Sequence, residues 1–170
     1  MILFLDTVSP FPEFSVIQDS KVIQSIQILN EKSNKISDCI IPVFIKLQKK
    51  LLLNSKIEKL IVCTGPGSYT ALRVGIAFMY GLSFSKNIPL IGISSPDLFQ
   101  FVLPKSNIKK TLMFTCSSNN QNFIITFSNQ AVKYLIKRLD YNLSSPRIDF
   151  NKYNYSISNY KLSSDMIKTL

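Results

Sequence analysis

A glycine-rich turn is the part of this sequence whose residue types and spacing most suggest chemistry. The stretch from residue 63 to 95 reads CTGPGSYTALRVGIAFMYGLSFSKNIPLIGISS, and Gly65, Pro66, Gly67 and Ser68 open a helix-like segment within it. Backbone amides at a helix start attract anions, so such a turn is a common setting for phosphate. The first question is therefore whether this turn binds a nucleotide.

The turn matches neither common phosphate-binding motif. A P-loop places a lysine after its last glycine to pair with phosphates, and a dinucleotide loop needs Gly-x-Gly-x-x-Gly. The segment GPGSYTALR has no lysine. Pro66 also removes one of the amides that would face an anion. We expect no nucleotide and no other cofactor.

Other catalytic and metal chemistries are limited by composition. The chain has no histidine, and Cys39, Cys63 and Cys116 show no metal-type spacing. A zinc site is therefore not expected, and the usual general base at neutral pH is missing. We expect no catalytic residue and no metal ligand, and any catalysis would rest on carboxylates.

The net charge is +10, and of the 20 basic residues only Arg73, Arg138 and Arg147 are arginine. Lysines that neutralise phosphates bind nucleic acid without regard to sequence. The same lysine excess, beside many Ile, Asn, Phe and Tyr residues, is also what codon drift in an AT-rich genome produces. Weak attraction to RNA follows under either interpretation.

The length and the apolar runs favour a soluble protein. A chain of 170 residues can form one domain, or two small lobes, with a real core. The longest apolar run, residues 74–84, is shorter than the roughly eighteen residues that cross a bilayer. The start MILFLDTVSP has no basic leader and no cleavage site. We expect a cytoplasmic location and no membrane contact.

The elements that must position the turn begin with strands. Residues 2–8 form an apolar run, typical of a buried strand, and two strand-like runs follow, separated by Asp19 and Ser20, a hairpin signal. Apolar residues then recur at spacings of four, four, three and four, which predicts an amphipathic helix over residues 37–53. Pro42 predicts either a kink or a regular helix that starts near Cys39.

The second half of the pattern alternates strands and helices. KIEKLIVCTG predicts a strand, Ser68 is placed to cap a helix over residues 68–85, IPLIGISS predicts a strand and PDLFQFVL a short helix. The order βββαβαβα predicts the ribonuclease H-like half of the actin-like ATPase fold, an α/β fold with a mixed five-stranded sheet. We expect this lobe over residues 1–103. A shortened, diverged second lobe and tail would occupy residues 104–170, with a hairpin of TLMFTC and NFIITF, an ambiguous QAVKYLIKRL, and an irregular end.

This fold suggests two further chemistries, ATP binding and metal-dependent cleavage of nucleic acid. The nucleotide-binding turn of actin-like proteins needs a glycine where DTVS has Val8. A ribonuclease H-like nuclease remains an alternative, since carboxylates on strand ends bind Mg²⁺. Asp6 suits that role, but the fourth strand ends at Thr64, and Asp38 and Asp97 are better explained as helix-start residues.

The helix after the glycine turn carries one charge, Arg73, and is apolar or small on every face. One face of this helix can pack on the sheet. The opposite face would expose apolar side chains to solvent unless another element packs on it. The small residues Ala71 and Gly75, spaced by four, would let another helix approach. The second lobe of the same chain is the alternative cover, but the pattern favours a protein partner.

The segment TGPGSYTALRVGIAFMYGLSFSKNIPLIGISSPDLF resembles the signature of the TsaB (YeaZ) family, and ILFLDTVS and SDCIIPVFIKL fall in the family's order. The resemblance covers residues 1–103. It implies a non-catalytic, actin-like-fold subunit of the machinery that makes N6-threonylcarbamoyladenosine beside the anticodon of ANN-decoding tRNAs. It also implies pairing with the catalytic TsaD subunit and the TsaE ATPase, a homodimer of the isolated chain as an alternative, and only indirect or weak tRNA contact.

The resemblance further implies that the helices at 37–53 and 68–85 form the surface for TsaD or a second copy. The glycine turn would then position an interaction helix. The residues expected at this interface are Ile36, Ser37, Ile40, Phe44, Ala71, Leu72, Arg73, Gly75, Ile76, Phe78, Met79 and Leu82. The second lobe departs from the family, whose Asp-Ala-Arg-type strand is replaced here by Thr115, Cys116 and Ser117.

Overall fold

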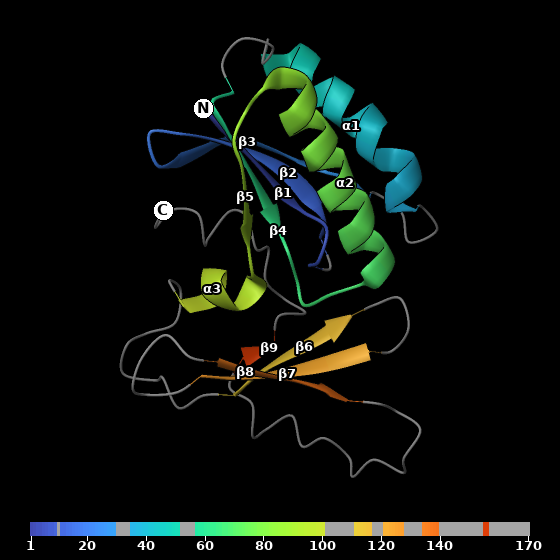
Figure 1. Cartoon of the computed structure of the whole chain (residues 1–170), viewed down its shortest axis with the longest axis vertical. Helices are drawn as coiled ribbons and strands as arrows, with labels where there is room; N and C mark the ends of the chain where they lie inside the picture. The colour runs from blue at the N-terminus through green and yellow to red at the C-terminus, as the bar shows by residue number, and fades with distance from the viewer. Residues whose placement is uncertain are drawn as a thin grey trace.

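The computed structural model describes most of the first hundred residues and the backbone of four later strands (Figure 1). Side chains are described up to residue 98. The described ranges are 1–9, 11–29, 35–51, 57–100, 111–116, 121–127, 134–139 and 155–156.

A mixed five-stranded sheet forms the centre of the first part of the chain. Its strands are β1 (Ile2–Asp6), β2 (Glu13–Gln18), β3 (Lys21–Gln27), β4 (Lys59–Cys63) and β5 (Leu90–Ile93), in the order β3-β2-β1-β4-β5. β2 runs antiparallel to both of its neighbours, whereas β4 is parallel to β1 and to β5. The predicted mixed sheet is confirmed.

The turn between β2 and β3 confirms the predicted hairpin. Asp19 and Ser20 have φ angles of 50° and 58°. Two successive residues in the left-handed region match the right-handed twist of the strands on either side. This turn therefore lets β2 and β3 pair closely.

Two long helices, α1 (Ile36–Leu51) and α2 (Tyr69–Lys86), lie side by side over one face of the sheet, and the short α3 (Ser95–Gln100) follows β5 (Figure 1). α1 contains Pro42 and starts at Ile36, so of the two predicted alternatives the late start near Cys39 is excluded. Asn87 caps the C-terminal end of α2, has left-handed backbone angles and donates its N–H to the Ser83 carbonyl.

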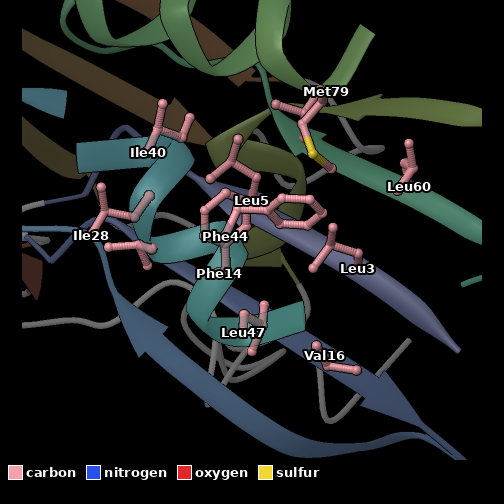
Figure 2. Packing of buried hydrophobic residues seen from close by; sticks show 12 residues of the cluster. Leu3, Leu5, Phe14, Val16, Ile28, Ile40, Phe44, Leu47, Leu60 and Met79 are labelled. Carbon is pink, nitrogen blue, oxygen red and sulfur yellow. The ribbon is translucent and has the colours of Figure 1, made fainter. Parts of the chain in front are cut away.

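The core lies between these two helices and the sheet. The rings of Phe14 from β2, Phe44 from α1 and Phe78 from α2 pack together with centroids 5.1–5.6 Å apart. Figure 2 shows Phe14 and Phe44 among the other buried side chains of this cluster, which include Leu3, Leu5, Val16, Ile28, Ile40, Leu47, Leu60 and Met79. Each long helix is thus fixed to the sheet through an aromatic ring.

The later strands form a second sheet in the order β8-β7-β6-β9. β6 (Thr111–Cys116) and β7 (Gln121–Phe127) pair antiparallel, which confirms the predicted hairpin. β8 (Tyr134–Leu139) shows that the ambiguous QAVKYLIKRL segment contains a strand, and β9 is Tyr155–Ser156. The predicted division at residues 103 and 104 lies outside the described residues and stays a prediction, as does most of the irregular tail.

No helix in the described ranges has the length and apolar character needed to cross a bilayer.

Candidate functional site

The glycine turn is packed between the end of β1 and the start of α3. A side chain at Gly67 would place its Cβ 2.6 Å from Val8 Cγ1, and Gly65 has a φ of 98°. Ser95 donates its backbone N–H to the Gly65 carbonyl at 2.8 Å. Glycine is therefore required here by close packing and backbone angle. Ser68 takes the predicted N-cap position of α2, but its side chain makes no capping hydrogen bond.

The turn after β1 is stabilised by the carboxyl group of Asp6, the last residue of that strand. Asp6 Oδ1 accepts the backbone N–H of Val8 at 2.7 Å and of Ser9 at 3.2 Å. These are amides of the turn that carries phosphate in actin-like nucleotide-binding proteins. Since Asp6 already occupies them, they are not free to face a ligand.

Asp6 is completely buried, and burial raises the pKa of its carboxyl group above the ordinary value, against the opposing effect of the Ser9 and Val8 hydrogen bonds. Glu13 lies directly opposite Asp6 in the β1–β2 register and is also buried. Ser15 Oγ donates to Glu13 Oε1 at 3.3 Å. Glu13 was not among the predicted site residues, although a carboxylate inside the apolar segment FPEFSV indicates an unusual buried group.

The structure does not bring a metal-binding carboxylate cluster together in the part that it describes. Among those residues, no three His, Cys, Asp or Glu side chains are grouped closely enough to hold a metal ion. Asp38 and Asp97 lie in the first turns of α1 and α3, as predicted. Asp97 also receives a hydrogen bond from Ser94 Oγ. Both aspartates therefore have the helix-start positions expected of them.

Cys63 is buried at the end of β4, with its Sγ 3.4 Å from Ser95 Oγ. Burial, with a smaller effect from the charge of Asp6, raises the pKa of this thiol to about 12. The thiol is therefore protonated at neutral pH and a poor nucleophile.

Several residues predicted at the partner interface lie in this chain's own core. The buried ones are Ile40, Phe44, Ala71, Gly75 and Met79. The interface prediction is wrong for these five, because these positions are already buried within the chain. Phe78 packs on Phe14 and Phe44, while Ile36, Leu72 and Leu82 are half-buried.

Gly75 shows most directly why these predicted interface residues lie in the core. A Cβ at Gly75 would lie 2.7 Å from Thr7 Cγ2 and 2.8 Å from Thr7 Oγ1. The expectation that Gly75 would let a partner helix approach is therefore wrong. The small residue allows α2 to approach β1, not a second helix to approach α2.

The exposed side of α2 carries a different set of large side chains. Tyr69, Ile76, Tyr80 and Phe84 are exposed, and Phe84 is 84% exposed. Arg73, also exposed, places its guanidinium 5.1 Å from the centre of the Tyr69 ring. Spacings of three and four residues place all five on one stripe of the helix. Only Arg73 and Ile76 of this stripe were predicted as interface residues.

The stripe is extended by α1. Ile41 and Ile45 are exposed, and Ile41 lies one turn before Phe44, whose ring contacts Phe78 of α2. Gly81 lies one turn after Phe78 and has open space where a side chain would stand. The six exposed large apolar side chains of the two helices are here called the apolar outer face: Ile41, Ile45, Tyr69, Ile76, Tyr80 and Phe84.

Comparison of the sequence identifies relatives of one kind. The family model described as "TsaD: tRNA N6-adenosine threonylcarbamoyltransferase" matches residues 29–148. The tRNA N6-adenosine threonylcarbamoyltransferase of Thermosipho melanesiensis is 36% identical over 95 residues, which make up 55% of this chain and 29% of that protein. The chain thus spans less than a third of the length of this curated relative.

Solved structures share the fold. YeaZ from Pseudomonas aeruginosa has a TM-score of 0.58 and 14% identity, over 81% of this chain and 65% of that chain. A protein described as uncharacterized, with similarity to the peptidase YeaZ from Pseudomonas aeruginosa, has the same score and identity over 87% and 70%. These likenesses confirm the predicted actin-like, ribonuclease H-like fold class.

Proposed function

The chain belongs to the TsaD family, tRNA N6-adenosine threonylcarbamoyltransferase, and we propose that it serves that chemistry as a non-catalytic subunit of the TsaB (YeaZ) type. Its partner in this proposal is a TsaD-like catalytic subunit. A TsaE-like ATPase joins the assembly, and a homodimer is the alternative state of the isolated chain.

The observation that carries the proposal is the apolar outer face. Large apolar side chains grouped on the exposed side of two neighbouring helices are typical of protein interaction sites. Tyrosine and arginine are over-represented among the residues that dominate binding energy, and Tyr69, Arg73 and Tyr80 supply both kinds. Gly81, which has no neighbour within 4 Å of a Cβ, leaves room for a partner's side chain beside them.

A supporting role is also consistent with the chemistry near the strand ends. The chain has no histidine, Asp6 binds the amides of its own turn, and the Cys63 thiol is buried. None of these groups is placed to activate a substrate. Among the described residues, Asp6 and the opposite Glu13 are the carboxylates that favour the ribonuclease H-like alternative.

The test is co-purification with the TsaD-family catalytic protein from the same genome. Ile45 on α1 is 44% exposed and Ile23 on β3 is 45% exposed, so they form a matched pair of surface isoleucines. Ile45→Arg should lower affinity for the catalytic subunit at least about tenfold, because a charge buried against the partner without an opposite charge costs well over 1.4 kcal/mol, the free energy of a tenfold change. Ile23→Arg should bind as the unchanged protein does.

Circular dichroism and thermal unfolding of both variants serve as the folding control, since both positions are exposed. Equal binding by Ile45→Arg and the unchanged protein would exclude this face as the docking surface. Absence of any complex with the unchanged chain would exclude the partner role. Threonylcarbamoyl transfer by the chain alone, measured on tRNA, would contradict the non-catalytic assignment.

A further inference from the structure

Five lysines lie together at one end of the central sheet. Ile2, the first residue of β1, pairs with Lys59 of β4, and Lys21 is the first residue of β3, which is parallel to β1 through β2. α1 and α2 return to this same end (Figure 1), with Lys49 and Lys50 in the last turn of α1 and Lys86 in the last turn of α2. We call these five residues the lysine end.

Side chains in the described part of the chain do not neutralise the positive charge of the lysine end. All five lysines are exposed, and none of them makes an ion pair with another described residue. The nearby Glu58 carboxylate is 3.4 Å from the amino terminus of Met1, and Asp19 accepts from Gln18. The described residues at this end thus contribute five lysines and one amino terminus, but two carboxylates.

The charge is unevenly distributed along the sheet. At the opposite end, Lys35 and Arg73 are matched by Asp38 and Asp97, which lie near the helix starts. Lysines in the last turn of a helix also offset the partial negative charge there. The helix dipole does not explain why Lys21 and Lys59 lie at this end, because both are on strands.

We propose that the lysine end binds the phosphate backbone of RNA without reading its sequence. Lysine is depleted in protein interfaces, whereas it is a common phosphate ligand that acts as a point charge. A row of phosphates gains affinity from such charges through counterion release and needs no apolar core. The surface lies at the helix ends, away from the middle of the apolar outer face, so this inference goes beyond the partner role proposed above.

The test uses the full chain and fluorescently labelled unfractionated tRNA, with anisotropy measured at several salt concentrations. Lys59→Gln and Lys86→Gln should each reduce the slope of log affinity against log salt by about 0.7–0.9, the contribution of one phosphate contact. Lys35→Gln removes the same charge at the opposite end and should leave the slope unchanged. Thermal unfolding confirms that all three variants fold.

An equal reduction by Lys35→Gln would show that net charge alone drives binding, which overturns the proposal. Absence of salt-dependent binding to tRNA overturns it as well. Tighter binding to polyglutamate or to phosphatidylserine vesicles than to tRNA at equal salt would assign the lysine end to another class of polyanion.

Discussion

Gly75 and Gly81 both lie within α2, but Gly75 is packed against Thr7 and Gly81 is open to solvent. Replacing each by alanine therefore distinguishes the effect of helix propensity on stability from the effect of packing. Gly81→Ala should stabilise the protein by about 0.5–1 kcal/mol, because alanine favours a helix and the site is open. Gly75→Ala should destabilise it by about 1–3 kcal/mol, because the new methyl group would collide with Thr7. Urea unfolding of both variants measures the two effects.

A second substitution identifies the cause of the loss at Gly75. Thr7 Oγ1 is buried and has no hydrogen-bond partner in the described part of the chain, so Thr7→Ala removes both atoms that crowd the glycine. Combined with Gly75→Ala, it should restore most of the lost stability. A double variant no more stable than Gly75→Ala alone would show that the helix–strand contact is not the cause.

Asp6 should make the protein less stable as pH rises. Because its pKa is raised above 3.8 by burial, the folded protein holds a proton that the unfolded chain has already released. The free energy of unfolding therefore falls from about pH 3.8 upward and levels off above the raised pKa. Asp6→Asn removes this contribution, and denaturant unfolding between pH 4 and 8 measures it.

Asparagine keeps an oxygen that can accept from Val8 and Ser9, so the turn after β1 should persist in this variant. The difference in unfolding free energy between the unchanged protein and Asp6→Asn is the quantity to follow. A difference that stays constant with pH, or that favours the unchanged protein more as pH rises, would contradict the raised pKa.

At the scale of elements, the type and order of the segments could be predicted from the sequence. The apolar and strand-like runs predicted the strands, and the apolar spacing from Ile36 to Leu51 predicted α1. Asp19 and Ser20 marked the hairpin because short polar residues tolerate left-handed backbone angles. These signals are local, and local chemistry was enough to interpret them.

Which face of each helix packs on the sheet and which is exposed could not be predicted from such local signals. α2 is apolar all round, so its periodicity cannot tell the side against β1 from the side in solvent. Ala71 and Gly75 were therefore predicted at a partner interface, although both are buried within the chain, while Tyr80 and Phe84 were overlooked. Only the position of α2 over the sheet, a long-range contact, distinguishes the two sides.

The whole molecule should not bind ATP when isolated. Asp6 accepts from the amides of Val8 and Ser9, and a phosphate would have to displace this carboxyl group from a buried position. Calorimetry should give a dissociation constant weaker than about 1 mM, which corresponds to about −4 kcal/mol. Val8→Gly should not create binding, since the carboxyl group would remain. A micromolar constant for the unchanged chain would contradict this account.

The rings of Phe14, Phe44 and Phe78 belong to one strand and two helices, and each ring packs against the other two. Such a contact holds the helices at a fixed separation and angle, because neither can shift without opening space in a close-packed core. A protein that docks on these helices would meet a preformed surface. The entropy lost on association would then come mainly from exposed side chains such as Tyr80 and Phe84. Association should accordingly proceed as a single rigid encounter, at about 10⁵–10⁷ M⁻¹s⁻¹, without a slower rearrangement step.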